Sequence, residues 1–235
     1  MSGYDEIAGL YDPWSRSVVE DVQFYVAEAL AVGPGPIVEL GVGTGRIAVP
    51  TAIEGVRVIG VDSSEGMLRV CRETAELAGV AELLDLRLGD LRRPPVPERV
   101  GLVTCPFRAF LHLRTDDERM DALRGARELL VPGGRLVFDV FAPGDEDIAS
   151  THDRWIEREQ GIFERAFWDR ETRTLTLSVR GPQGSTTMAL AWLSPAEWED
   201  LLGRAGFEVI ACYGWFDRRP YDGGEDTIWI ARRPG

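Results

Sequence analysis

The residue types best suited to bind a ligand follow three short apolar runs of the sequence. The first run leads into VELGVGTGR, a turn with glycine at every second position (Gly41, Gly43 and Gly45). Glycine permits positive φ angles and has no Cβ atom, so a ligand can lie directly against such a backbone. The second run ends at Asp62 and the third at Asp90. A carboxylate can accept both hydroxyls of a ribose or the amino group of a purine, so the three features together predict a nucleoside site.

The spacing of these glycines argues against a phosphate ligand. The dinucleotide pattern G-x-G-x-x-G requires glycine at position 46, which is arginine here. The pattern G-x-x-x-x-G-K-[ST] is also absent, and the chain contains no lysine at all. A nucleotide-dependent oxidoreductase is therefore the weaker alternative. A tight strand-to-helix turn without any ligand is the other reading of the glycines alone.

Composition excludes several other classes of function. The net charge is −13 over 235 residues, and such an acidic surface repels the phosphates of nucleic acid. The absence of lysine excludes a Schiff-base lysine. Three cysteines without C-x-x-C spacing and only two histidines make a metal site unexpected. We therefore expect no metal and a small-molecule partner rather than nucleic acid.

The location of the protein is expected to be cytoplasmic. No apolar run approaches the roughly 20 residues that a membrane span needs, and the N-terminal residues lack the basic and apolar regions of a signal peptide. We expect no association with a membrane, and a monomer or a homodimer.

Alternating strand and helix patterns must position these residues. Short apolar or β-branched runs predict strands, and the helix expected after Asp62 buries Met67 and ends at Gly79. Thr115 and Glu118 form a capping box before the helix that VPGG ends. The alternation predicts an α/β fold, with a parallel sheet covered by helices on both faces and ligand residues at the strand ends. The expected strands are 36–40, 56–62, 84–90, 100–105 and 135–141.

The two ends of the chain depart from this alternation. The first residues read as an aromatic-rich helical arm, and period-two alternation after Phe141 around GPQG predicts inserted antiparallel strands. Ser194, Pro195 and Glu197 then begin a helix that two final strands follow. We divide a single domain, 1–235, into an arm or lid (1–33), a ligand-binding core (36–141), an antiparallel insertion that caps the substrate (150–193) and a closing unit (194–235).

The series VELGVGTGR, VIGVDSSEGML, LRLGDL and LLVPGGRLVFDVF resembles the motifs of class I S-adenosylmethionine-dependent methyltransferases. The tyrosine-bearing arm is similar to that of small-molecule enzymes such as glycine/sarcosine and amino-sugar N-methyltransferases. The resemblance implies a Rossmann-like, seven-stranded, mostly parallel sheet whose last strand is antiparallel to the rest.

The resemblance also implies a cofactor, S-adenosyl-L-methionine, with S-adenosyl-L-homocysteine as the product. Glu39 and the glycine turn would flank its methionine portion, Asp62 would hold the ribose, and Asp90 with Leu91 would contact the adenine. The candidate cofactor residues are Tyr11, Arg16, Glu39, Gly41, Gly43, Gly45, Asp62, Ser63, Met67, Gly89, Asp90, Leu91, Cys105 and Pro106.

Methyl transfer from a sulfonium to nitrogen or oxygen is a direct displacement, so the enzyme mainly aligns the reactants and excludes water. His112 is a candidate general base and Tyr11 a candidate for stabilising the cationic methyl donor. A structural histidine, a surface ion pair at Arg108 and aromatics packed in the core remain alternatives, as does a cofactor-binding partner without activity. The candidate substrate residues are Tyr4, Trp14, Phe107, Arg108, Tyr213 and Trp215.

Overall fold

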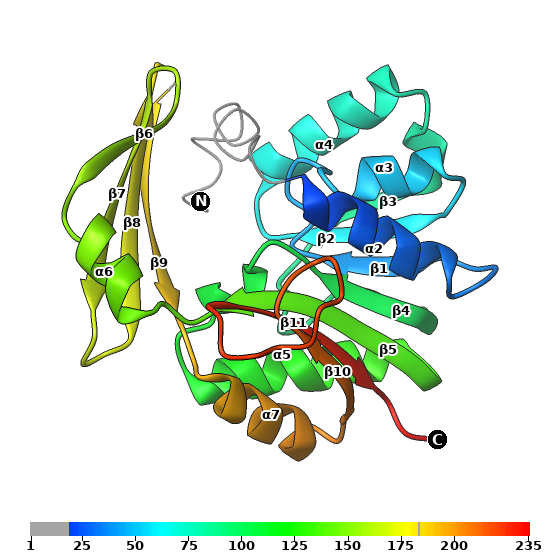
Figure 1. The fold of residues 1–235 in the computed structure, drawn as a ribbon. Coiled ribbons are helices and arrows are strands. Elements are labelled where there is room, and N and C mark those ends of the chain that lie inside the picture. The colour runs from blue at the N-terminus through cyan, green and yellow to red at the C-terminus, as the bar shows by residue number, and fades with distance from the viewer. Residues whose placement is uncertain (1–18, 183) are drawn as a thin grey trace.

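A computed structural model describes residues 19–182 and 184–235 of the chain. In this part of the chain a seven-stranded sheet has the order β10-β11-β5-β4-β1-β2-β3, and a second sheet has the order β6-β7-β8-β9 (Figure 1). The strands of the larger sheet are β1 (Ile37–Leu40), β2 (Val58–Asp62), β3 (Leu84–Leu88), β4 (Val100–Cys105), β5 (Leu130–Phe141), β10 (Glu208–Tyr213) and β11 (Asp226–Arg232).

Parallel pairing joins the strands that carry the predicted ligand residues. Strand β1 pairs in parallel with β2 and β4, β2 with β3, and β4 with β5. The last strand, β11, lies between β5 and β10 and is antiparallel to both. The fold class expected from the sequence is therefore confirmed, including the antiparallel last strand.

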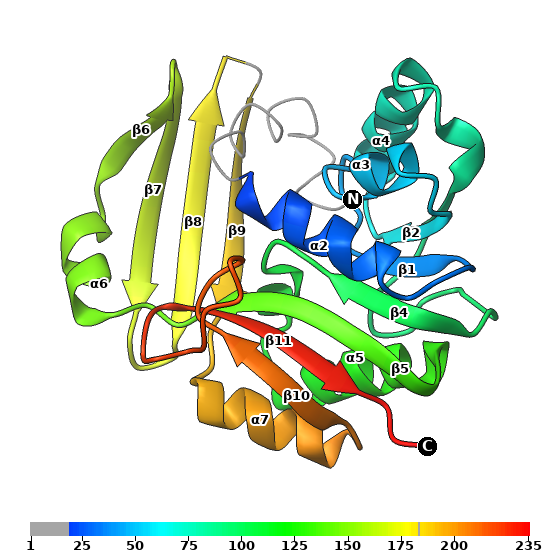
Figure 2. The same cartoon turned by 45° about the vertical axis from the view of Figure 1, so that its right-hand side comes forward.

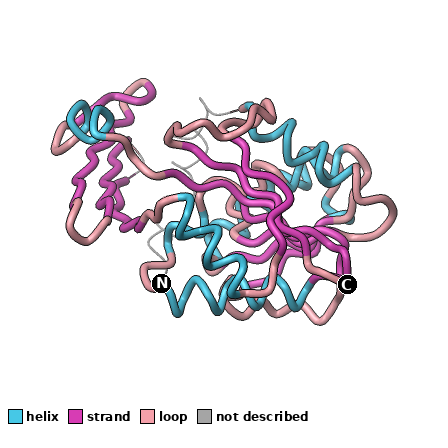
Figure 3. The backbone as a smooth tube through the Cα atoms, turned by 60° about the horizontal axis from the view of Figure 1, so that its bottom comes forward, coloured by secondary structure: helices cyan, strands magenta, loops and turns pink. Residues whose placement is uncertain are grey.

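Helices cover both faces of the seven-stranded sheet (Figures 1 and 3). On one face lie α2 (Glu20–Leu30), α3 (Ala48–Ile53) and α4 (Glu65–Leu77), with a 3₁₀ turn, η1 (Ala81–Leu83), before β3. On the other face lie α5 (Asp116–Leu129) and α7 (Pro195–Arg204). The predicted capping boxes begin α5 at Thr115 and α7 at Ser194. None of the helices in the described residues is long and apolar enough to cross a membrane.

The predicted antiparallel insertion forms a separate four-stranded sheet beside the core (Figure 2). It follows α6 (Asp145–Thr151) and consists of β6 (Trp155–Glu159), β7 (Ile162–Asp169), β8 (Thr174–Gly181) and β9 (Gly184–Ala191). Alternate residues of β8, Leu175, Leu177 and Val179, are buried in one hydrophobic cluster with side chains of α5 and α7. The period-two pattern of the sequence thus marks the face of the insertion that packs inward.

One strand begins earlier than its apolar pattern predicts. The VPGG segment belongs to β5, which begins at Leu130 immediately after α5 ends, rather than at residue 135. The register between β4 and β5 shifts between Val100 and Leu102, and Gly133 has a φ of +80°. A bulge with a glycine in the left-handed region lets the chain enter the strand without a separate loop, and bulges leave little trace in an apolar pattern.

Candidate functional site

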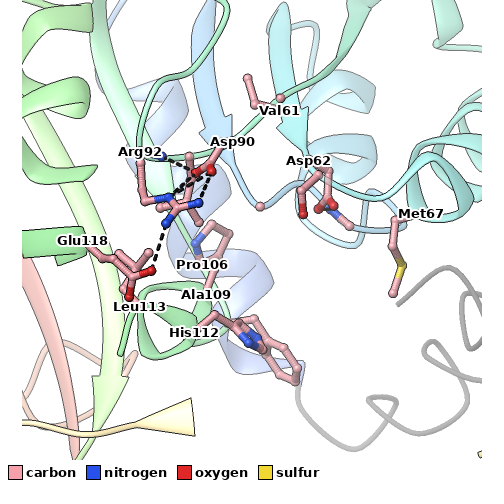
Figure 4. A pocket seen from close by; sticks show the side chains of 16 residues that line it. Val61, Asp62, Met67, Asp90, Arg92, Pro106, Ala109, His112, Leu113 and Glu118 are labelled. Carbon is pink, nitrogen blue, oxygen red and sulfur yellow. Dashed lines mark hydrogen bonds and ion pairs between the residues drawn. The ribbon is translucent and has the colours of Figure 1, made fainter. Parts of the chain in front are cut away.

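A pocket of about 390 Å³ lies at the carboxyl ends of β1, β2, β3 and β4 (Figure 4). Asp62 and Met67 approach it from one side, Asp90 and Arg92 from the other, and Pro106 and Ala109 lie between them. Parallel strands end at the same edge of the sheet, which is why residues far apart in the sequence meet here. The predicted residues that line this pocket are Gly41, Gly43, Asp62, Ser63, Met67, Gly89, Asp90, Leu91, Pro106, Phe107 and His112.

The glycine turn presents bare backbone to the pocket at Gly43. Its φ is +55°, and a Cβ atom built there would meet nothing closer than the Gly41 carbonyl oxygen at 4.0 Å. This open space in front of the backbone is what a closely bound ligand requires. Gly45 differs, because a Cβ atom there would lie 2.6 Å from Cys71 Sγ. Gly45 therefore faces the packing of α4 and does not line the pocket.

Asp62 connects the glycine turn to the start of α4. Its Oδ2 accepts a hydrogen bond from Gly43 N–H at 2.9 Å, and its Oδ1 accepts one from Ser64 N–H at 2.9 Å. Ser64 in turn caps α4, because its Oγ accepts from Met67 N–H at 3.1 Å. The carboxylate at the end of β2 is thereby fixed in direction, and each carboxylate oxygen can accept more than one hydrogen bond, including one from a hydroxyl group.

Asp90 lines the same pocket just after β3 and is linked through Arg92 to Glu118 by ion pairs. Its carboxylate accepts from Arg92 N–H at 2.8 Å and from Arg92 Nε at 2.9 Å, and Arg92 Nη1 donates to Glu118 at 2.9 Å (Figure 4). Hydrogen bonds from Arg92 lower the pKa of Asp90, so the carboxyl group is ionised. Arg92 and Glu118 also line the pocket and were not among the residues predicted for it.

Glu39 lies on β1, two residues before the turn, and is buried. Its Oε2 has no hydrogen-bond partner, and burial raises the pKa of its carboxyl group to about 8. A buried carboxylate oxygen without a donor is costly unless a cation or a proton satisfies it. Glu39 does not line the pocket, and its unsatisfied carboxyl group lies two residues before the glycine turn along the chain.

Arg46, which interrupts the dinucleotide pattern, connects three elements. Its guanidinium is ion-paired with the buried carboxylate of Asp21 on α2, with Nη1 and Oδ1 2.9 Å apart. The same guanidinium lies 4.3 Å from the centre of the Phe107 ring, after β4. Arginine at this position therefore joins the glycine turn to α2 and to the pocket wall, a role that glycine cannot fill.

His112 lines the pocket from a short 3₁₀ helix, η2 (Ala109–His112). Burial lowers the pKa of its imidazole to about 4, because a charged ring would lose its hydration there. The side chain is therefore neutral at physiological pH. A neutral imidazole can accept a hydrogen bond, but its low pKa makes it a weak proton acceptor.

Other predicted residues lie away from the pocket. Arg108 donates from Nη2 to Asp226 at 2.8 Å and lies over the Phe141 ring, and Cys105 is fully buried at the end of β4. Tyr213 packs against Phe24 of α2, and Trp215 against Phe216. Arg108 therefore forms the ion pair, and Tyr213 and Trp215 the aromatic packing, that the sequence offered as alternatives to a role at the site. The predicted arm residues Tyr4, Tyr11, Trp14 and Arg16 lie outside the described residues.

The donor set of the pocket fits S-adenosylmethionine on three observations of the structure. Gly43 leaves backbone open to contact, and Asp62 is oriented by Gly43 and Ser64. Two residues before the turn, the buried Glu39 carboxyl group has an oxygen without a hydrogen-bond partner, which is the kind of acceptor that an ammonium group requires. Within residues 19–182 and 184–235, no group of three or more histidine, cysteine, aspartate or glutamate side chains is placed to hold a metal ion.

Comparisons with known proteins agree with this arrangement. A family model described as a methyltransferase domain matches residues 37–134. An uncharacterized methyltransferase of Geobacillus kaustophilus, GK2543, is 32% identical over 157 residues, which cover 60% of this chain and 70% of that protein. The solved structure of the CcbJ methyltransferase from Streptomyces caelestis is 30% identical with a TM-score of 0.88, covering 100% of this chain and 99% of that one.

A more distant structure shares the fold. SAM-bound CalS10, an amino pentose methyltransferase from Micromonospora echinaspora, is 22% identical with a TM-score of 0.67, and 93% of each chain is covered.

Proposed function

Since the chain belongs to the class I S-adenosylmethionine-dependent methyltransferases, we propose that it transfers a methyl group to a nitrogen or oxygen of a small-molecule acceptor. This proposal rests mainly on one observation: the same pocket is lined by Gly41 and Gly43 of the turn, by Asp62 and Asp90, and by His112. Each is a weak signal in the sequence. Their meeting in one cavity supports binding and reaction at the same place.

The cofactor half of the pocket has a role for each group. We propose that Gly43 provides close backbone contact and that the Glu39 carboxylate neutralises an ammonium. Asp62, held by two backbone N–H groups, accepts ribose hydroxyls. Asp90 and Leu91 contact the base, with Arg92 fixing the direction of the Asp90 carboxylate.

The bound cofactor would supply a methyl group already activated on a sulfonium. The chain then has to align an acceptor and keep water away. Phe107, Ala109 and Leu113 provide apolar wall in the same cavity as the neutral His112. We propose that this wall excludes water, and that His112 accepts a hydrogen bond from the acceptor and orients its lone pair.

The acceptor is proposed to be a small molecule, with amino sugars and related amines as the first class to assay. The description of CalS10 as an amino pentose methyltransferase supports this order of testing. The insertion, 150–193, is proposed to cap the acceptor and the arm, 1–33, to act as a lid. Contributions from Tyr4, Tyr11, Trp14 and Arg16 remain predictions, as do a cytoplasmic location and a monomeric or homodimeric state.

Isothermal calorimetry with S-adenosylhomocysteine tests the cofactor half of this proposal. We expect the wild-type chain to bind S-adenosylhomocysteine saturably and to show no binding of NAD⁺ under the same conditions. Asp85→Asn, a change at a partly exposed acid of β3 that is paired with Arg87 outside the pocket, is a matched control and should bind normally. Failure of the wild-type chain to bind S-adenosylhomocysteine would refute the proposal.

Methyl transfer is tested with isotopically labelled S-adenosylmethionine over a panel of amino sugars, other amines, phenols and heterocycles. We expect label in at least one amine or hydroxyl acceptor, with one S-adenosylhomocysteine formed per methyl transferred. Binding of S-adenosylhomocysteine without labelling of any acceptor would favour a cofactor-binding partner without activity.

A further inference from the structure

A buried carboxylate on β5, Asp139, has contacts that the proposed chemistry does not use. Its Oδ1 accepts a hydrogen bond from Tyr25 Oη at 2.6 Å and one from Phe107 N–H at 2.8 Å. Its Oδ2 accepts one from Arg108 N–H at 3.1 Å. Asp139 is 6% exposed and Tyr25 is 1% exposed. One carboxylate thus joins helix α2 to two consecutive backbone amides of the segment after β4.

Those two amides belong to residues in an unfavourable backbone conformation. Phe107 has a φ of +54° and Arg108 a φ of +63°, and neither is glycine. Residues with a side chain seldom adopt this region, because Cβ approaches the backbone, and they stay there only where neighbouring groups hold them. Asp139 accepts from the N–H group of each. The carboxylate therefore helps to hold this pair of left-handed residues in place.

Because its amide is bound by Asp139, Phe107 links that carboxylate to the pocket. It lines the cavity, and its ring lies 4.3 Å from the Arg46 guanidinium of the glycine turn. Arg46 is ion-paired with Asp21, which precedes Tyr25 by one turn on the same face of α2. These contacts form a closed network: Asp21 of α2 pairs with Arg46, Arg46 contacts Phe107, the Phe107 amide donates to Asp139, and Asp139 accepts from Tyr25 of α2.

We propose that Asp139 is a positioning residue: by holding the backbone of Phe107 and its neighbour Arg108, it fixes the Phe107 wall of the pocket against the glycine turn, so that the acceptor is aligned for methyl transfer. This inference rests on the proposed function for the reaction it serves. It does not require Asp139 to touch cofactor or acceptor.

The charge of Asp139 supports this role. Burial raises the pKa of its carboxyl group to about 6, against the lowering effects of the Tyr25 hydrogen bond and of Arg108. The titratable groups around it are Tyr25 and Asp21 from α2, Arg108 from the loop and Cys105 from β4. Above about pH 6 the carboxylate is ionised and can accept from all three donors. Protonation turns one oxygen into a donor, so the hold on the two amides weakens as the pH falls.

Hydrogen exchange measures this hold without any acceptor. Peptides covering residues 103–111 are followed by mass spectrometry in wild type, Asp139→Asn, Tyr25→Phe and Asp226→Asn. Asparagine presents an N–H group to one of the two amides, so we expect at least tenfold faster exchange in this segment, and a smaller increase in Tyr25→Phe. The Asp226 carboxylate accepts from the Arg108 guanidinium, whereas the amides of Phe107 and Arg108 donate to Asp139, so Asp226→Asn should leave exchange of this segment unchanged. Equal protection in wild type and Asp139→Asn would overturn the proposal.

The pH dependence separates a charge-dependent hold from ordinary packing. The protection factor of the segment should fall below about pH 6 in the wild type and stay level in Asp139→Asn. A profile that is the same in both proteins would contradict the role of the ionised carboxylate. Should Asp139→Asn fail to fold, a wild-type-like exchange rate in Tyr25→Phe would contradict the proposal that the Tyr25–Asp139 hydrogen bond helps to hold the Phe107–Arg108 segment.

Binding and turnover then distinguish this inference from the proposed function. In Asp139→Asn we expect S-adenosylhomocysteine affinity and the KM for S-adenosylmethionine within threefold of wild type. We expect kcat to fall at least tenfold with any acceptor that the panel identifies. An unchanged kcat, or a loss of S-adenosylhomocysteine binding, would overturn the positioning role. A wild-type chain that does not bind S-adenosylhomocysteine would refute the proposed function, while the exchange experiment would still decide whether Asp139 holds the loop.

Discussion

The backbone N–H of Gly43 donates to Asp62 Oδ2 at 2.9 Å, so the bare turn after β1 and the acid at the end of β2 form one unit. Asp62 therefore has two roles, because it orients the turn and is also the proposed ribose ligand. An effect of its mutation on binding has to be separated from an effect on folding.

Asp62→Ala should weaken S-adenosylhomocysteine binding by roughly 10- to 100-fold, the value of about 1.5–3 kcal/mol that hydrogen bonds to a charged group contribute. Asp62→Asn retains one oxygen acceptor for Gly43 or Ser64, so it should fold better while still binding weakly. Calorimetry gives the affinity and thermal unfolding the stability. An Asp62→Ala variant with wild-type affinity would remove Asp62 from the proposed site.

Alanine at two glycines of the same turn should have different effects, mainly on ligand binding at Gly43 and mainly on stability at Gly45. Gly43→Ala places a Cβ atom in the open space of the pocket, so stability should fall only by about 1–2 kcal/mol for the left-handed φ while S-adenosylhomocysteine binding falls at least tenfold. Gly45→Ala carries the same backbone cost and also a clash at Cys71 Sγ, which adds about 1–3 kcal/mol of overpacking. The comparison uses the unfolding temperature and the affinity of each variant. A Gly43→Ala variant that binds normally would show that the ligand does not contact this backbone.

Binding should release a proton from Glu39. With a pKa of about 8, roughly 90% of this carboxyl group is protonated at pH 7. A bound ammonium would favour the charged form, so S-adenosylhomocysteine binding at pH 7 should release close to one proton. Calorimetry in buffers of different ionisation enthalpy measures this number. Glu39→Gln should release none and bind more weakly, and proton release equal to wild type in that variant would assign it to another group.

The same carboxyl group should affect stability over a defined pH range. Its pKa is raised from 4.5 in the unfolded chain to about 8 in the folded one, so the folded state retains a proton that the unfolded state loses. This contribution to stability is full below about pH 4.5 and is lost as the pH rises to about 8. Urea unfolding of wild type between pH 5 and pH 9 should therefore show a decline that is shallower in Glu39→Gln. Parallel curves would contradict the buried, proton-binding state of Glu39.

Local patterns predicted the sheet and the acids at the strand ends, because hydrophobic period, caps and strand ends are properties of neighbouring residues. Glu118 shows the limit of that information. Its capping box with Thr115 is visible three residues apart, but its ion pair with Arg92 joins positions 26 residues apart. The contact of Tyr25 with Asp139 spans 114 residues. No spacing rule predicts such pairs, since the folded sheet brings them together.

The three glycines of the turn also looked equivalent in the sequence. The structure distinguishes them by what lies in front of each missing Cβ, open pocket at Gly43 and the Cys71 side chain at Gly45. Tyr213 and Trp215 pack with aromatics near α2 rather than in this pocket, because β10, which ends at Tyr213, lies at the far edge of the sheet from β3. Strand order over long connections is a property of the whole fold.

His112 should contribute by orientation more than by proton transfer. A general base works best when its pKa lies near the working pH and then contributes about 100- to 10,000-fold, whereas the pKa of His112 is lowered to about 4. His112→Gln, which keeps a hydrogen-bond acceptor, should therefore retain turnover within roughly tenfold of wild type, and His112→Ala should lose more. The pH–rate profile between pH 6 and pH 9, measured with the best acceptor of the panel, should keep its shape in His112→Gln. A loss of more than about 100-fold in that variant, together with the loss of an inflection from the profile, would assign His112 as the general base.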